Sequence, residues 1–222
     1  MRIALLGGTG DIGQGLALRW GFDTNHELLI GSRDPEKART AADEYETELE
    51  NRGVEPSIKG FENAMAADRA DVVVLAVPAY HLVDTIESIG DRLDPETVLV
   101  TPAVGMQRDE AGFHYNQPGA GSVAALAAEA TPDGVALVGA FHNLPAGGLA
   151  NLDRSIEWDT LVFGDDDDAK SIVSELADGI DGLRPLDVGG LANASEVEAI
   201  TPLLINVARA NDGLHDLGVK FR

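Results

Sequence analysis

A glycine-rich turn directly after the first apolar run constrains this chain more than any other feature. Ile3-Ala4-Leu5-Leu6 leads into Gly7-Gly8-Thr9-Gly10-Asp11-Ile12-Gly13, and helix-forming residues follow over 14–20. Glycine is needed where a chain turns tightly, where backbone N–H groups must approach phosphate, and where a helix packs closely on its strand. The order of strand, turn and helix therefore favours a dinucleotide pyrophosphate site over a glycine-rich turn without a nucleotide.

The residues after the second expected strand, 27–30, indicate which nucleotide is bound. A carboxylate that would accept hydrogen bonds from a free 2′-hydroxyl is missing there, and Gly31-Ser32-Arg33 stands in its place. Ser32 and Arg33 can hold a 2′-phosphate through charge-assisted hydrogen bonds, and Lys37 adds a positive charge one helical turn later. The pattern predicts NADP.

Two acidic residues argue against NADP, because the carboxylate of Asp34 or of Glu36 could turn toward the ribose. A structural interpretation is also open. In it Ser32 is the N-cap of the next helix, Asp34-Pro35-Glu36 forms the first helical turn, and Arg33 is solvated. The two interpretations of Ser32 are compatible, since a capping residue can also bind phosphate.

The charge balance narrows the range of partners. The 222 residues include 38 Asp and Glu against 16 Lys and Arg, which gives a formal net charge of −22. Nucleic acid is excluded as an expected partner because its binding requires positive charge. The acids are spread along the chain, so we expect an intracellular protein of a salt-adapted organism, in which molar salt screens their repulsion over roughly 3 Å.

Other absences bound the class of protein. There is no cysteine, so disulfides and thiolate ligands are excluded, and no run of eighteen apolar residues predicts a membrane span. The chain opens directly on an expected strand, so we predict a soluble, unprocessed, cytoplasmic protein. Its length suits one large core, or a nucleotide domain with a small companion.

Strand-like and helix-like segments alternate along the chain, which predicts a parallel sheet. The expected strands are 3–6, 27–30, 57–59, 72–77, 98–101 and 136–141, with helices at 14–20, 35–50, 62–67 and 122–130. Strands at 161–163 and 184–187 flank a helix at 165–180, and a last helix covers 195–210 with a kink or fresh start at Pro202. We predict an α/β, Rossmann-type doubly wound sheet over 1–142, with a smaller C-terminal region over 143–222.

Ligands of such sheets bind outside the carboxyl ends of the strands. The segments that leave those ends, 78–81, 102–105 and 142–146, are mostly apolar and supply two histidines and one amide. Neither a Ser-His-Asp order nor a metal-ligand pattern is present. A site this poor in acid–base groups suits a reaction in which the cofactors hold the reactivity and the protein orients them and excludes water.

These motifs together resemble a known family. Gly7-Gly8-Thr9-Gly10 with Gly13, Gly31-Ser32-Arg33, His142 with Pro145-Ala146, and three later motifs are similar to NADPH-dependent coenzyme F420 reductases of archaeal type. The later motifs are Gly164-Asp165-Asp166-Asp167, Gly182-Leu183-Arg184-Pro185-Leu186-Asp187 and Thr201-Pro202-Leu203-Leu204. The resemblance covers essentially the whole chain. It implies direct hydride transfer between NADP and coenzyme F420, an 8-hydroxy-5-deazaflavin, with the two rings stacked in a shared cleft.

The resemblance also implies which residues contact the cofactors. Residues Gly8, Thr9, Gly10, Asp11, Ile12 and Gly13 would surround the pyrophosphate, Ser32, Arg33 and Lys37 the 2′-phosphate, and Val77, Pro78, His81, Ala103 and Val104 the nicotinamide half. His142, Asn143, Leu144, Pro145 and Ala146, with Leu203 and Asn206 of the last helix, would form the deazaflavin side. Asp11 replaces the family's usual amide and Asn143 its usual threonine. An acid is unfavourable beside pyrophosphate unless it turns away to cap the helix.

Several structural interpretations stay open beside these roles. His81 is equally explained as a solvated helix residue, and His142 as a satisfied buried histidine. The acids 165–168 complement a helix dipole better than they indicate a cation site, and no metal is expected. The apolar residues 203–205 suit a core or a homodimer interface.

Two rival functions also remain. An imine or ketone reductase would need a proton donor at the ring, which His142, His81 or Tyr80 would have to supply. A non-catalytic NADP sensor would need a surface patch for its partner. For the anionic side chain of the deazaflavin, Arg108, Arg154 and Arg209 are candidates by elimination. The residues do not encode the physiological direction of hydride flow.

Overall fold

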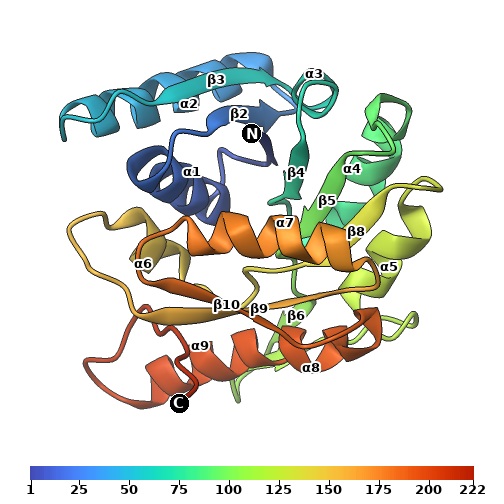
Figure 1. The fold of residues 1–222 in the computed structure, drawn as a ribbon. Helices are drawn as coiled ribbons and strands as arrows, with labels where there is room; N and C mark the ends of the chain where they lie inside the picture. Colours follow the sequence, from blue (N-terminus) through green and yellow to red (C-terminus); the bar gives the residue numbers. More distant parts are fainter.

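The architecture is a mainly parallel sheet of eight strands that is covered by helices on both faces (Figure 1). The computed structural model describes residues 1–222. Its strand order is β10-β9-β8-β5-β4-β1-β2-β3, and every neighbouring pair is parallel except β8 and β9. The strands are β1 (Arg2–Leu6), β2 (Glu27–Ser32), β3 (Ser57–Glu62), β4 (Val72–Leu75), β5 (Val98–Thr101), β8 (Ala136–Gly139), β9 (Trp158–Gly164) and β10 (Leu183–Asp187). The prediction of a Rossmann-type α/β fold is confirmed.

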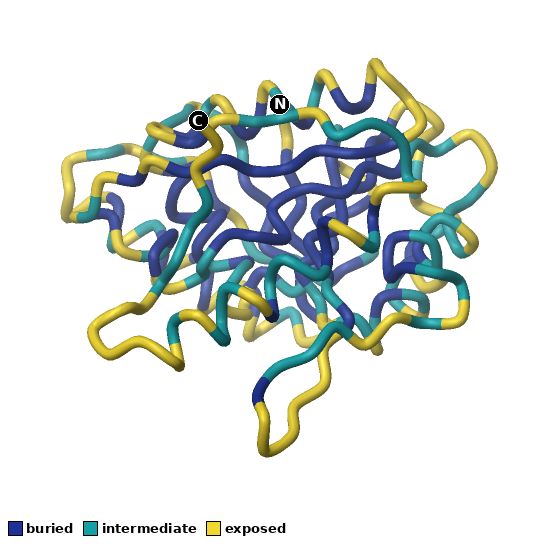
Figure 2. Tube along the Cα trace, turned by 90° about the horizontal axis from the view of Figure 1, so that it is seen from below, coloured by how far each residue is buried: buried dark blue, intermediate teal, exposed yellow.

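The helices divide between the two faces of the sheet. They are α1 (Asp11–Asp23), α2 (Pro35–Glu50), α3 (Asn63–Ala67), α4 (Leu82–Ile89), α5 (Val123–Ala130), α6 (Ala146–Ala150), α7 (Asp167–Asp178), α8 (Ala194–Glu198) and α9 (Ile200–Ala210). In β1, Ile3 and Leu5 pack into a core with α1, α2, α6 and α7, whereas Ala4 and Leu6 pack into a second core with α3, α4 and α5. Alternate strand residues thus fill both cores, as the period of two requires. Figure 2 shows the buried strands crossing the centre of the molecule.

Two strands end earlier than their apolar runs predict. β4 ends at Leu75, where the neighbouring β1 ends at Leu6 and turns away at Gly7, so no ladder partner remains for Ala76 and Val77. β8 ends at Gly139 because Phe141 has a left-handed backbone with φ of 66°. That conformation costs a non-glycine residue about 1–2 kcal/mol and turns the chain away from the sheet just before His142.

The prediction of one last helix over 195–210 is wrong in detail. α8 ends at Glu198 and α9 begins at Ile200, with Pro202 in its first turn. Proline has no N–H to donate to the carbonyl four residues earlier, which is that of Glu198, so the helix begins afresh. The fresh start that Pro202 indicated is therefore confirmed.

A small hairpin escaped prediction. β6 (Met106–Arg108) and β7 (Phe113–Tyr115) pair antiparallel after the end of β5. The hairpin is held from outside by two C-terminal residues. The side-chain amide of Asn206 in α9 accepts a hydrogen bond from the Phe113 N–H and donates one to the Phe113 carbonyl. The buried Glu198 carboxylate accepts a hydrogen bond from the Tyr115 hydroxyl at 2.8 Å.

Glu198 also joins α8 to the start of α5. Its carboxylate accepts from the N–H groups of Val123 at 3.0 Å and of Ala124 at 2.9 Å, two of the free donors at that helix start. Burial raises the pKa of Glu198, although these hydrogen bonds oppose the rise. The same side chain therefore fastens α5, α8 and the hairpin together.

The C-terminal segment is fastened along the first half of β9, which β8 does not reach. The Asp159 N–H donates a hydrogen bond to the Val219 carbonyl. The buried Asp159 carboxylate accepts hydrogen bonds from the Arg184 guanidinium at 2.9 and 2.7 Å, from the Lys220 ammonium and from the Phe221 N–H. The Arg184 guanidinium, acting with the other donors, lowers the pKa of Asp159. The strands of region 143–222 thus extend the same sheet as those of region 1–142.

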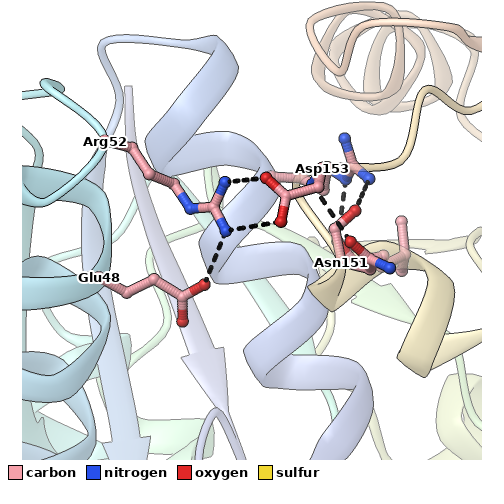
Figure 3. Close-up of polar contacts among 6 residues, drawn as sticks. Glu48, Arg52, Asn151 and Asp153 are labelled. Atoms are coloured by element: carbon pink, nitrogen blue, oxygen red, sulfur yellow. Dashed lines mark hydrogen bonds and ion pairs between the residues drawn. The ribbon is translucent and has the colours of Figure 1, made fainter.

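Two arginines tie the segment after α6 to the first two helices. Arg19 of α1 is buried, and its guanidinium donates to the carbonyls of Leu149 at 2.9 Å, Gly148 at 3.3 Å, Asn151 at 2.7 Å and Arg154 at 2.9 Å. Arg52, after α2, pairs with Asp153 at 2.6 Å and more weakly with Glu48 (Figure 3). Since α6 follows directly on residues 142–145, these contacts position that loop.

None of the helices is long and apolar enough to cross a membrane.

Candidate functional site

The glycine turn between β1 and α1 has the geometry that its sequence predicts. Gly7 has φ of 78°, and a Cβ on Gly13 would lie 2.6 Å from the Gly8 Cα. The helix therefore approaches the strand more closely than any side chain would allow. Gly10 is the N-cap of α1 and offers no side-chain acceptor, so the first N–H groups of the helix have no partner within the helix. Such a helix start binds anions.

A cavity of about 520 Å³ opens beside this turn. It lies at the carboxyl ends of β1, β2, β3 and β4, and α4 forms its outer wall. Its lining residues are Gly7, Thr9, Gly10, Ser32, Arg33, Glu62, Asn63, Ala76, Val77, Pro78, His81, Asp84, Thr85 and Ser88. The structure thus brings together the turn, the Ser32-Arg33 pair and the Val77-Pro78-His81 segment, as the sequence predicts.

The two acids that argued for NAD are engaged elsewhere. Asp34, not Ser32, is the N-cap of α2, and its carboxylate accepts from the Glu36 N–H at 3.0 Å. The structural interpretation of Ser32 as the cap is therefore wrong, because Asp34 directly precedes Pro35 at the first helical position. Ser32 instead accepts the Asp34 N–H, and Glu36 pairs with Arg39.

The positive charges at this end of the cavity have no carboxylate partner. Arg33 and Lys37 are exposed and form no ion pair, and Arg33 lines the cavity. The Asn63 side-chain oxygen is buried at the cavity wall without a hydrogen-bond donor. An unpaired cation beside an anion-binding turn fits a nucleotide that carries a 2′-phosphate, and the free Asn63 oxygen can accept from a hydroxyl or amino group of the same ligand.

A second cavity, of about 450 Å³, lies between the loop after β8 and α9. It is mainly apolar, and its lining residues are Asn143, Leu144, Pro145, Ala146, Thr201, Leu204, Ile205, Ala208, Arg209, Leu214, His215, Asp216 and Leu217. The buried Asn143 amide fixes the loop by donating to the Asp159 carbonyl at 2.7 Å and accepting the Leu161 N–H. The Thr201 hydroxyl donates to the His142 carbonyl at 2.7 Å, which joins α9 to the loop.

His142 is enclosed completely beneath this loop. Its ring stacks on Phe163 with centroids 5.2 Å apart, and neither ring nitrogen has a hydrogen-bond partner. Burial lowers the pKa of His142 to about 3, so the ring is neutral near pH 7. His142 is buried, as the structural interpretation held, but its hydrogen bonds are not satisfied.

Substituting His142 with phenylalanine should flatten the acid dependence of stability. The unfolded chain takes up a proton near pH 6.5, whereas folded His142 stays neutral down to about pH 3. The contribution of His142 to the free energy of unfolding is therefore largest above pH 6.5. It falls on acidification by about 1.4 kcal/mol per pH unit. Denaturant unfolding should show wild type losing roughly 2 kcal/mol more than His142→Phe between pH 7 and pH 5. Parallel pH profiles would rule out this role for the ring.

Other residues of the expected site lie outside both cavity linings. Ala103 is buried and Val104 half-buried after β5, and Ile12 is half-buried in the first turn of α1. Leu203 is 59% exposed on another side of α9. The Asn206 side-chain amide forms its hydrogen bonds with the Phe113 backbone. Asp11 does not cap α1; it is exposed in the first helical turn.

Several lining residues were not predicted from the sequence. Glu62, Asn63 and Asp84 line the first cavity, and residues 214–217 line the second. The position of Asn63 directly after β3 was an available signal, since that is the carboxyl end of a parallel strand. No group of three His, Asp or Glu side chains is arranged to hold a metal ion.

The sequence of this chain is similar to those of known proteins. Residues 2–105 match the family described as NADP oxidoreductase, coenzyme F420-dependent. The chain is 40% identical over 212 residues to an F420-dependent NADP reductase of Methanocaldococcus jannaschii, covering 93% of this chain and 92% of the relative. It is 41% identical over 211 residues to the F420-dependent NADP reductase of Methanothermobacter thermautotrophicus, covering 93% and 89%.

A solved structure shares the fold along its whole length. A protein of Arthrobacter sp. FB24, described as an F420-dependent NADP-reductase, aligns over 100% of this chain and 99% of its own with a TM-score of 0.81 and 23% identity.

Proposed function

The chain belongs to the family of NADP oxidoreductases that depend on coenzyme F420, and we propose that it transfers a hydride directly and reversibly between reduced coenzyme F420 and NADP. When bound, the two coenzymes supply the hydride donor and the hydride acceptor. The protein's task is then to bind both, to align them and to exclude water.

The first cavity would hold NADP. We assign the pyrophosphate to the turn that contains Gly8, Thr9, Gly10, Asp11, Ile12 and Gly13, and the 2′-phosphate to Ser32, Arg33 and Lys37. Val77, Pro78 and His81 would contact the nicotinamide half, with Ala103 and Val104 beyond them at the end of β5. The unpaired Arg33, which lines the cavity together with residues at the free start of α1, supports this assignment.

The second cavity would hold the deazaflavin, closed by residues 143–222. His142, Asn143, Leu144, Pro145 and Ala146 would position the ring, and α9 would form the opposite wall. Asn206 would act indirectly by fastening the hairpin to α9, whereas the exposed Leu203 lies outside the cavity lining.

One observation carries this function: an apolar second cavity follows β8, which neighbours β5 in the sheet, and His142 lies beneath the loop of that cavity with both ring nitrogens buried. An imine or ketone reductase needs a proton donor at the ring. Both ring nitrogens of His142 are sealed beneath the loop, so His142 cannot serve as that donor.

A spectroscopic assay tests the function. Purified protein should bleach the visible absorbance of oxidised coenzyme F420 when NADPH is added, and should restore it on addition of excess NADP. NADH should support far less change. Tight NADP binding without any change in the deazaflavin spectrum would favour the sensor hypothesis instead.

We also propose that the protein is a salt-adapted, archaeal-type member of the family that works in the cytoplasm and does not bind nucleic acid. The net charge of −22 supports this proposal. Unfolding temperature and turnover are expected to rise from dilute buffer to molar KCl, because the salt screens repulsion among the carboxylates. Maximal stability in dilute buffer would contradict the proposal.

We further propose a homodimer. Leu203 and Val207 lie one helical turn apart on α9 and are exposed, which is the stripe that a partner helix would cover. Light scattering in the salt of the assay should give twice the chain mass of 23.3 kDa, and a monomer mass would contradict the proposal.

A further inference from the structure

Only some of the lysines and arginines of this chain are paired with carboxylates. Eight of its sixteen lysines and arginines form ion pairs with carboxylates, namely Arg2, Arg39, Arg52, Lys59, Arg92, Lys170, Arg184 and Lys220. Arg19 is satisfied by backbone carbonyls. A chain with 38 acids could pair every cation, so the arginines without a carboxylate partner stand apart.

Two of the unpaired arginines lie over one aromatic ring, and one of them lines the second cavity. Arg108, at the end of β6, lies over the Phe113 ring with its guanidinium carbon 5.5 Å from the centroid. Arg209, near the end of α9, lies at 5.5 Å from the same centroid and also lines the cavity. Both residues are exposed, so their guanidinium donors are accessible to a ligand.

Specific contacts hold the hairpin that carries Arg108 and Phe113 against α9. Asn206 of α9 accepts the Phe113 N–H at 2.9 Å and donates to the Phe113 carbonyl at 2.6 Å. Gly112 lies so close to α9 that a Cβ there would be 2.5 Å from the Asn206 side-chain oxygen. The hairpin is thereby held against α9, which brings Arg108 to Arg209 across 101 residues of sequence.

Carboxylates of the same elements do not neutralise the pair. The Asp109 carboxylate accepts hydrogen bonds from the N–H groups of Ala111 and Gly112 and contacts the His114 ring. The Asp216 carboxylate contacts the His215 ring. Glu110 and Asp212 are exposed and form no ion pair with either arginine. Two guanidinium groups held by stacking, with their donors free, are suited to a carboxylate or phosphate group.

We propose that Arg108 and Arg209 form an anion clamp that binds the negatively charged side chain of the deazaflavin coenzyme while its ring occupies the apolar cavity. This proposal rests on the proposed function. It explains how so acidic a chain binds an anionic coenzyme: the two arginines over Phe113 form no ion pair with a carboxylate and are free for the ligand. Arg154 is not part of the clamp, since it lies over Trp158 instead.

Equilibrium binding separates the clamp from the ring site. Coenzyme F420 and 8-hydroxy-5-deazariboflavin, which carries the ring without the anionic chain, are titrated by fluorescence into wild type, Arg108→Gln, Arg209→Gln and the control Arg92→Gln. Arg92 is also exposed, and it precedes β5, whereas the hairpin follows that strand, so Arg92 lies toward the opposite end of the strand, beside Asp68. We expect either clamp variant to raise the Kd for coenzyme F420 roughly five- to twentyfold, and that for the deazariboflavin less than twofold. Arg92→Gln should change neither.

Distinct outcomes overturn distinct claims. Equal weakening of both ligands, or no weakening of either, would contradict the clamp, whereas wild type that binds neither ligand would refute the proposed function itself. An unchanged Kd for NADP in each variant checks that the fold is intact.

Discussion

Arg33→Gln is expected to abolish most of the preference for NADP over NAD. Arg33 lines the first cavity beside Ser32 and has no carboxylate partner, so its guanidinium is free for the 2′-phosphate. A charge-assisted hydrogen bond of this kind contributes about 1.5–3 kcal/mol, which corresponds to a roughly 10- to 150-fold loss of NADP affinity. Affinity for NAD, which lacks the phosphate, should stay within about twofold.

The matched control lies on the following helix. Arg39 of α2 is exposed and pairs with Glu36, so Arg39→Gln removes the same charge without removing a phosphate ligand. Calorimetric titration of both nucleotides into wild type and the two variants gives the comparison. If Arg33→Gln weakened NADP and NAD equally, its effect would be on the fold or on the pyrophosphate, and the assignment of the 2′-phosphate would be lost.

Arg19→Met is expected to produce the largest loss of stability of any substitution considered. The buried guanidinium satisfies four carbonyls around the end of α6, and methionine would leave the two buried ones, of Leu149 and Gly148, without this donor. Removing such a network costs about 3–5 kcal/mol. For a chain of this size, the unfolding temperature should fall by roughly 10 °C.

Arg52→Met is the control for that loss. It detaches the same segment, but its partner Asp153 is exposed, and surface ion pairs contribute at most about 1 kcal/mol (Figure 3). Thermal unfolding of the two variants in one buffer distinguishes them. Equal losses would mean that the Arg19 carbonyl contacts carry no special weight in fixing α6.

The order of elements could be predicted because each depends on local pattern. The helix at 35–50 was predicted with its observed ends, since Pro35 sets its first turn and apolar residues recur along one face. The strand at 98–101 was equally clear, because it is an apolar run followed directly by Pro102. Errors arose where a partner decides the outcome, as when β4 ended at Leu75 because its neighbour β1 had already turned.

The hairpin illustrates the limit of local reasoning. Its strands are three residues long and carry no clear alternation, and Asn206, 93 residues from Phe113, holds them in place. The C-terminal segment along β9 likewise depends on Asp159, whose burial no local pattern signals. The second cavity is likewise assembled from segments far apart in the sequence, namely the loop after β8, α9 and residues 214–217. This explains why the nucleotide side of the site was easier to predict than the deazaflavin side.

Isotope transfer tests the central claim most directly. NADPH labelled with deuterium at nicotinamide C4, prepared separately on each face, is incubated with the protein and oxidised coenzyme F420, and the product is analysed by mass spectrometry and NMR. Direct transfer between aligned rings predicts that the label from one face appears at deazaflavin C5 without dilution by solvent hydrogen. Reduced coenzyme whose C5 hydrogen came from water would contradict the account.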